Sequence, residues 1–178
     1  LGSDLKHLSP LLESKIKAEV AMMLDWESWW ALELDSKPSM DVRLYDQLAL
    51  HFGPLFCSSI TSDFVHPSSD LSRYKLVVIP NLYQVTAENA KNIESYVENG
   101  GTVVMSFFSG IADENEHIWV GGYPALFKKM LGILTEEFAP AGGGQKFSVR
   151  FKDGSTTTTD LWSEVIHLEG AESFAAFT

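Results

Sequence analysis

Cysteine, basic residues and long apolar runs are all scarce in this sequence of 178 residues. The single cysteine, Cys57, excludes an internal disulfide and a cysteine-rich zinc site. Thirteen Lys and Arg against 24 Asp and Glu give a net charge of −11, which repels nucleic acids and anionic membranes. No apolar run approaches the roughly 18 residues needed to cross a bilayer. These absences predict a cytoplasmic protein that binds neither nucleic acid nor membrane.

Motifs for phosphate and metal binding are absent as well. A nucleotide or flavin site needs a glycine-rich turn after the first strand, and this chain has Asp25-Trp26-Glu27 in that place. The five histidines show neither H-x-x-x-H nor H-x-H spacing. We therefore expect no cofactor and no metal ion. A flavin carrier with a flavodoxin-like fold stays open as an alternative, and a yellow colour of the purified protein would reveal it.

The chain does contain alternating strand and helix patterns. Continuous apolar segments at 18–24, 76–80 and 102–107 predict strands that are covered on both faces. Between the last two, residues 87–99 predict a helix with Thr86 as its N-cap and a Gly-Gly pair after its end. A strand, a helix and a strand of these lengths favour a parallel crossover. The pattern predicts an α/β fold, a flavodoxin-like or class I glutamine amidotransferase-like three-layer sheet with helices on both faces.

Two further helices and a change of texture complete the predicted organisation. One helix is expected at 42–55, ended by Gly53-Pro54, and another at 124–131. Past the glycine-rich stretch that follows residue 140, apolar and polar residues alternate, which predicts antiparallel strands. We expect one α/β domain excised from something longer, made of a lead-in segment (1–16), a doubly wound core (17–140) and a C-terminal β extension (141–178).

Ser109 and His167 are the candidates for catalysis by this chain alone. Ser109 follows the predicted strand at 102–107, where an acyl-transfer enzyme carries its nucleophile, but the glycines of G-x-S-x-G are missing. His167 and Glu169 form an H-x-E pair as in class I glutamine amidotransferases, although one face of an alternating strand explains them equally well. A stand-alone amidotransferase-like hydrolase is therefore the alternative function. It requires the Ser109 hydroxyl within hydrogen-bond reach of His167.

Three tryptophans within five residues are the most unusual feature of the sequence. A helix that begins near Trp26 would put them on one side, because their spacing is i, i+3 and i+4. Aromatic anchors of this kind are typical of protein interfaces, and packing in the domain's own core is the alternative. The candidate interface or substrate-cleft rim consists of Trp26, Trp29, Trp30, Glu33, Asp113, Glu114 and His117.

Several longer segments occur in a fixed order along the chain. They run from VAMMLDWESWWAL at 20–32 through DLSRYKLVVIPNLY at 70–83 and GGTVVMSFFSGIADEN at 100–115 to IHLEGAE at 166–172. This series resembles the glycoside hydrolase family 42 β-galactosidases, and the resemblance covers essentially the whole chain. One departure is Ser28, where the family usually has Asn.

The resemblance implies the middle domain of such an enzyme, with a glutamine amidotransferase-like fold that mediates trimer formation. In the family, the catalytic glutamates and a four-cysteine zinc site lie in a preceding barrel, which agrees with the single cysteine here. The implied partners are that barrel and the neighbouring protomers of a homotrimer. The parent enzyme is then expected to hydrolyse terminal β-D-galactosides, and this chain alone is expected not to.

Overall fold

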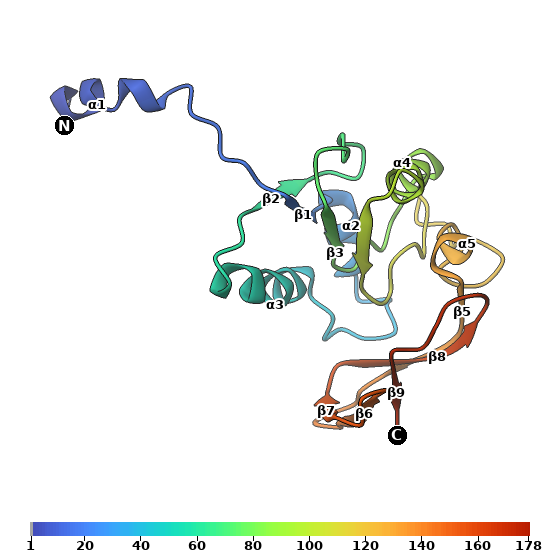
Figure 1. Ribbon diagram of the computed structural model, residues 1–178. Coiled ribbons are helices and arrows are strands. Elements are labelled where there is room, and N and C mark those ends of the chain that lie inside the picture. The colour runs from blue at the N-terminus through green and yellow to red at the C-terminus, as the bar shows by residue number, and fades with distance from the viewer. Residues whose placement is uncertain (1) are drawn as a thin grey trace.

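The computed structural model describes residues 2–178, with a four-stranded parallel sheet at the centre (Figure 1). The strand order is β2-β1-β3-β4, which is the flavodoxin-like order. The predicted α/β class is therefore confirmed. The four strands are β1 (Val20–Met23), β2 (Ser62–Val65), β3 (Leu76–Ile79) and β4 (Thr102–Met105).

Helices cover both faces of the sheet, as the three-layer prediction requires. In β1, Ala21 and Met23 face the core cluster that includes residues of α4, whereas Met22 faces the cluster that includes residues of α2 and α3. This alternation follows from the period of two along a strand, and it divides the interior into two cores. The three helices are α2 (Trp26–Leu32), α3 (Leu44–Cys57) and α4 (Ala87–Glu98).

Helix α4 matches the sequence prediction closely. The Thr86 hydroxyl accepts a hydrogen bond from the Asn89 N–H at 3.1 Å and so caps the first turn. Ile93 and Tyr96 are buried against the sheet. Gly100 follows the helix with φ +91°, a left-handed backbone that favours glycine.

The predicted end of α3 at Gly53-Pro54 is wrong, because the helix continues to Cys57 with Pro54 inside it. Proline removes one N–H and prevents one helical hydrogen bond. Pro54 is exposed, so water can satisfy the carbonyl that loses its partner. Strand β2 then begins at Ser62.

The predicted helix at 124–131 is also shorter in the structure, where α5 spans Lys128–Leu131. The preceding residues form a tight turn, in which the Phe127 N–H donates to the Pro124 carbonyl at 2.8 Å. This turn directs Phe127 into the core, where it is fully buried. Gly132 has φ +65° and ends the helix.

The C-terminal part of the chain is antiparallel, as predicted. Strand β5 pairs with β8, although 21 residues separate them, and β6 lies between β7 and β9. Because β5 comes before residue 140 and β8 after it, their pairing links the predicted core to the predicted extension. The five strands are β5 (Ile133–Pro140), β6 (Phe147–Phe151), β7 (Thr156–Thr159), β8 (Trp162–Leu168) and β9 (Ala175–Phe177).

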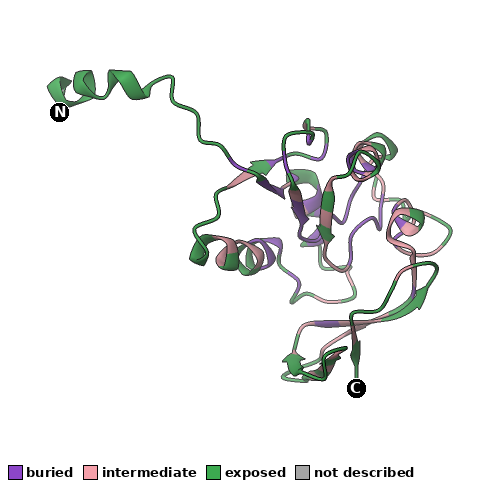
Figure 2. Ribbon diagram, in the orientation of Figure 1, coloured by how far each residue is buried: buried purple, intermediate pink, exposed green. Residues whose placement is uncertain are grey.

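The N-terminal segment extends away from the sheet (Figure 1). It contains α1 (Gly2–His7) and a short 3-10 helix at Ser9–Leu11, and Figure 2 shows it exposed along its whole helical length, while buried residues concentrate in the parallel sheet. Among residues 2–178, no helix is long and apolar enough to cross a membrane.

Candidate functional site

The carboxyl ends of the parallel strands carry most of the residues that the sequence singled out. β1 leads into Asp25, β3 into Asn81, and β4 into the turn at 106–110. In an open α/β sheet, ligands bind at this edge, beside the point where the strand order reverses. That point lies here between β1 and β3.

The turn after β4 shares one feature with a nucleophile elbow, a strained backbone position, but no helix directly follows the turn and no nucleophile stands at that position. Phe108 has φ +54°, a left-handed conformation that a bulky side chain rarely adopts. An elbow holds its nucleophile at just such a strained position between strand and helix. The sequence analysis placed Ser109 there, and the structure instead places Phe108 there. Its ring packs 5.1 Å from Phe138 and 4.9 Å from Trp162, measured between ring centroids.

The Ser109 hydroxyl is fully engaged by the backbone. Its oxygen donates to the Ser106 carbonyl at 3.0 Å and accepts from the Leu82 N–H at 3.0 Å, in a residue that is 3% exposed. The His167 imidazole instead contacts Glu136, with 2.5 Å between Nε2 and Oε2. Both hydrogen-bonding functions of Ser109 therefore serve the fold, and the geometry does not support a Ser109–His167 hydrolase.

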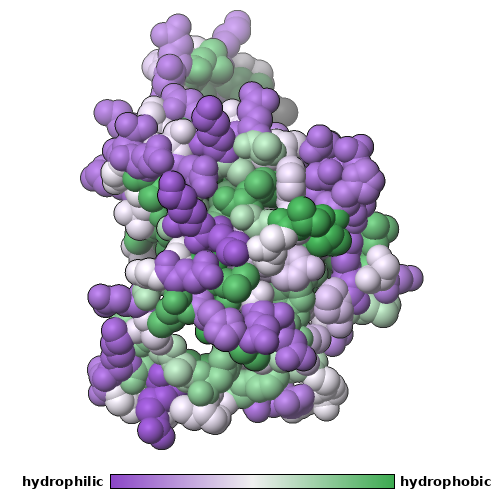
Figure 3. All heavy atoms as spheres, turned by 90° about the vertical axis from the view of Figure 1, so that its right-hand side faces the viewer, coloured by the Kyte–Doolittle hydropathy of each residue, from purple (hydrophilic) through white to green (hydrophobic). Residues whose placement is uncertain are grey.

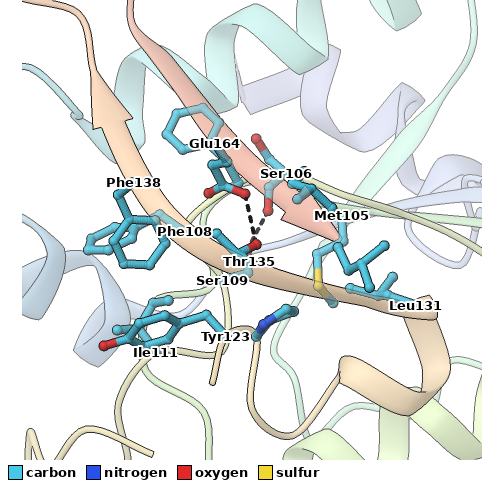
Figure 4. A pocket seen from close by; sticks show the side chains of 14 residues that line it. Met105, Ser106, Phe108, Ser109, Ile111, Tyr123, Leu131, Thr135, Phe138 and Glu164 are labelled. Atoms are coloured by element: carbon cyan, nitrogen blue, oxygen red, sulfur yellow. Dashed lines mark hydrogen bonds between the residues drawn. The ribbon is translucent and has the colours of Figure 1, made fainter. Parts of the chain in front are cut away.

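A cavity of about 190 Å³ lies between this turn and strands β5 and β8 (Figure 4). Its walls are mainly apolar, and Glu164 brings a carboxylate to them. The Glu164 carboxylate accepts hydrogen bonds from the Trp162 indole at 2.9 Å and from the Thr135 hydroxyl at 3.2 Å. Burial raises the pKa of Glu164 above its usual value of 4.5, against the opposing effect of these hydrogen bonds.

Replacing Glu164 by glutamine is expected to stabilise the protein at neutral pH. A carboxyl whose pKa is raised by folding holds its proton more tightly in the folded state, so stability falls as the pH rises from 4.5 through the folded pKa. Glutamine removes this fall, and its amide still accepts from Trp162 and donates to Thr135. Urea unfolding between pH 4 and pH 8 measures the effect. The exposed Glu172→Gln serves as control, and equal pH slopes for Glu164→Gln and the unmodified chain would refute the argument.

Helix α2 presents its tryptophans largely to the surface. Trp26 and Trp30 are 53% and 65% exposed, and Trp29 is half-buried. The Trp26 and Trp29 rings stack at 5.1 Å with only 3° between their planes. The Trp29 indole donates to Glu33 at 2.8 Å, which ties this carboxylate to the cluster. Packing in the domain's own core therefore does not explain Trp26 or Trp30.

The start of α2 is held firmly at the sheet edge. Asp25 caps the helix, since its Oδ2 accepts from the Ser28 N–H at 3.2 Å. Ser28, which stands where the similar family usually has Asn, is 1% exposed, and its hydroxyl accepts from the Gln84 N–H at 3.1 Å. This bond fastens α2 to the segment after β3, so the exposed indoles stand on a rigid base.

The loop that carries Asp113, Glu114 and His117 is ordered by its own side chains. Asp113 Oδ1 accepts from the N–H groups of Asn115 and His117 at 2.8 and 2.9 Å. The loop residue Glu116 receives hydrogen bonds from Lys37 and Gln84. The ion pair between Lys37 and Glu116 could not be predicted from a local sequence pattern, because the two residues are 79 positions apart.

Lys37 is the group that joins this loop to the segment after α2. Its side chain is only 7% exposed, and its ammonium donates to Glu116 at 2.9 Å and to the Tyr83 hydroxyl at 2.7 Å. Burial lowers the pKa of Lys37, but the two hydrogen bonds outweigh burial, so the pKa lies above its ordinary value. Lysine therefore stays charged and fixes the loop against the sheet edge.

A second cavity, of about 260 Å³, lies between the start of α2 and this loop. Asp25 and Glu27 line one side of it, and Glu114 lines it as well. Of the predicted surface residues only Glu114 lines this cavity, and the three tryptophans lie outside its lining. His66, which directly follows β2, also lines it, and the sequence analysis did not select this residue. Its position after a strand of the sheet was the available signal.

Exposed apolar side chains also occur outside α2. Figure 3 shows the side of the molecule that carries α5 and β5, where hydrophobic patches interrupt the hydrophilic surface. Val120 is 91% exposed and Phe174 is 73% exposed. Extensive apolar exposure is typical of a protein that is covered by a partner.

Comparisons with known proteins indicate that this chain corresponds to one part of longer proteins. A β-galactosidase from Arthrobacter sp. is 44% identical over 178 residues, which is all of this chain and 25% of that protein. The β-galactosidase BgaB from Geobacillus sp. (strain Y412MC61) is 45% identical over 99% of this chain and 26% of its own length. This chain thus spans about a quarter of the length of these relatives.

The structural comparison gives the same assignment. A crystal structure of β-galactosidase from Bacillus circulans sp. alkalophilus matches with a TM-score of 0.94 and 34% identity, over 99% of this chain and 27% of that chain. The family model described as "Beta-galactosidase trimerisation domain" matches residues 18–178. The chain belongs to the β-galactosidase trimerisation domain family.

Proposed function

We propose that this chain is the assembly module of a longer β-galactosidase and that it holds three copies of the enzyme together. The observation that carries the proposal is the exposed tryptophan surface of α2, because a stable isolated domain has no use for two indoles that are more than half exposed. Tryptophans are the strongest anchors of protein interfaces. The description of the matching family, a trimerisation domain, supports the same role.

The proposed contact surface consists of α2 and the acidic loop. The partner across it is a neighbouring protomer or the catalytic barrel of the same enzyme. A rigid base favours this use, since Ser28 and Asp25 fix α2 and Lys37 fixes the loop before any partner arrives. The residues are those selected from the sequence: Trp26, Trp29, Trp30, Glu33, Asp113, Glu114 and His117.

Replacing Trp26 and Trp30 together by alanine in the enzyme that carries this chain is expected to weaken trimer formation. Each indole is an exposed anchor in the unassembled domain, so its loss should cost at least about tenfold in the association constant. Sedimentation velocity over a range of protein concentrations measures the shift from trimer to monomer. Circular dichroism checks that the domain stays folded.

Phe56→Ala is the matched control, because Phe56 is 69% exposed and lies at the far end of α3. It should leave the trimer intact. An undisturbed trimer in the double tryptophan variant would refute a contact between protomers through this surface, whereas loss of the trimer in Phe56→Ala would show that the effect is not specific to α2.

The hydrolysis of terminal β-D-galactosides is proposed for the whole enzyme and not for residues 1–178, which we infer to form one module within it. The supporting observation is that this chain spans about a quarter of the length of the β-galactosidases that it matches. The isolated chain should show no release of galactose from a chromogenic β-galactoside. A cytoplasmic location accords with a free, exposed Cys57 thiol, and cell fractionation tests it.

A further inference from the structure

Three potential metal ligands from two neighbouring strand ends meet at the edge of the sheet. Asp25 follows β1, Glu27 lies in the first turn of α2, and His66 follows β2. One ligand atom from each lies within 4.8 Å of the others. The closest measured approach is 3.3 Å, between His66 Nε2 and Asp25 Oδ1. Ligand atoms around one ion must lie at about this mutual spacing, given bonds of roughly 2.0–2.2 Å.

We propose that Asp25, Glu27 and His66 bind one divalent transition-metal ion, with Zn²⁺ as the reference ion. One imidazole and two carboxylates form a donor set that suits zinc and its neighbours in the first transition row. The inference does not depend on the proposed assembly function. It also departs from the expectation from the sequence, which considered the single cysteine and histidine-to-histidine spacing but no carboxylate ligands.

Asp25 is already arranged as a ligand. Its side chain is 9% exposed, and its Oδ2 is committed to capping α2. The other oxygen, Oδ1, is directed toward His66. A carboxylate that is buried and fixed by one oxygen presents the other with little loss of conformational freedom, which favours binding.

His66 is oriented in the way that ligating histidines usually are. Its Nδ1 lies 2.8 Å from the Ser68 hydroxyl and accepts from the Ser68 backbone N–H at 3.2 Å, and these contacts set the ring so that Nε2 faces Asp25. When the ion binds Nε2, the ring proton resides on Nδ1, which then donates to Ser68 Oγ in place of accepting from the Ser68 N–H. Ser68 thereby acts as a positioning residue for the site.

The cavity in front of these residues supplies room and further oxygen donors. It measures about 260 Å³, whereas a water molecule takes about 30 Å³ of liquid volume, so an ion can keep bound water there. Glu114 brings a third carboxylate to its lining, and Gln84 and Asn89 bring amide groups. Three carboxylates against one imidazole leave the hollow with surplus negative charge, which a divalent ion neutralises.

The other histidine–carboxylate contacts lack this convergence. His167 meets Glu136 alone, and both side chains are more than half exposed. Within residues 2–178, only the group of Asp25, Glu27 and His66 brings three such side chains close enough for one ion. His167 therefore provides an internal comparison with the same chemistry but without the third ligand.

Calorimetric titration of chelator-treated chain with ZnCl₂ tests the site. We expect one ion per chain and a rise in the melting temperature on adding zinc, because the ion joins α2 to the segment after β2. His66→Ala and Asp25→Asn should each weaken binding at least about tenfold. Asn remains a good N-cap, so the second variant keeps α2 folded, and circular dichroism verifies it.

His167→Ala is the matched control and should bind zinc as the unmodified chain does. Addition of Co²⁺ gives a second readout, since a nitrogen and oxygen site produces visible absorption that His66→Ala should abolish. Absence of binding for Zn²⁺, Mn²⁺, Co²⁺ and Ni²⁺ would overturn the proposal. Equal zinc affinity in His66→Ala and the unmodified chain would overturn it as well.

Discussion

Replacing Phe127 by alanine is expected to lower the free energy of unfolding by about 3–5 kcal/mol. Phe127 is 0% exposed and is the largest fully buried side chain of the described residues 2–178. It belongs to the core cluster on the α4 side of the sheet, and a Cβ at Gly110 would lie 2.8 Å from its ring. Truncation leaves a cavity against the elbow turn, and a closely packed interior cannot fill it.

Urea unfolding followed by tryptophan fluorescence measures this loss. Phe174→Ala is the control, since Phe174 is 73% exposed and should change stability by less than about 0.5 kcal/mol. If Phe127→Ala lowers the free energy of unfolding by less than about 1 kcal/mol, the turn at 124–127 fills the vacated space. In that case Phe127 does not stabilise the turn after β4.

Gly101→Ala should also be strongly destabilising, at the upper end of the roughly 1–3 kcal/mol typical of overpacking. A Cβ on Gly101 would lie 2.2 Å from the Tyr96 ring, which is far inside contact distance. The ring cannot turn away at low cost, because Tyr96 is 7% exposed and its hydroxyl donates to the Tyr74 carbonyl at 3.1 Å. The same hydroxyl lies 3.3 Å from the Thr102 carbonyl.

A double-mutant cycle separates this clash from a backbone effect. Combining Gly101→Ala with Tyr96→Leu should cost clearly less than the sum of the two single changes, since leucine has no ring to meet the new methyl group. Gly53→Ala is the control, because a Cβ there meets no atom within 4 Å and alanine favours the helix. Strict additivity in the cycle would refute the steric explanation.

Local sequence signals predicted those elements that depend on local chemistry. The β-branched run of β3, the Thr86 cap and Gly100 after α4 each act within a few residues, so the pattern was sufficient. The predicted end of α3 was wrong because an exposed proline destabilises a helix less than the sequence pattern implies. The helix after residue 124 was too long in the prediction because burial of Phe127 overrides helix propensity.

The candidate site was predicted only in part, for a related reason. The spacing of the three tryptophans indicated a cluster on α2, and the structure shows Trp26 stacked on Trp29 with Trp30 exposed. The meeting of His66 with Asp25 crosses 41 residues and follows from parallel pairing of β1 and β2. No periodicity within one segment reports such a contact.

By itself, the sequence determined the α/β class, the buried strands β1 and β3 and the presence of an aromatic cluster beside an acidic turn. These properties follow from composition and short-range periodicity, which act along the chain. The prediction that 102–107 is a strand covered on both faces was wrong, because Thr102 and Val104 of β4 are exposed. Only the tertiary structure decided that Phe108 occupies the strained turn after β4, that Lys37 holds the acidic loop, and that the side chains of Asp25, Glu27 and His66 converge. Each of these depends on strand order and packing, which bring distant residues together and which no local pattern encodes.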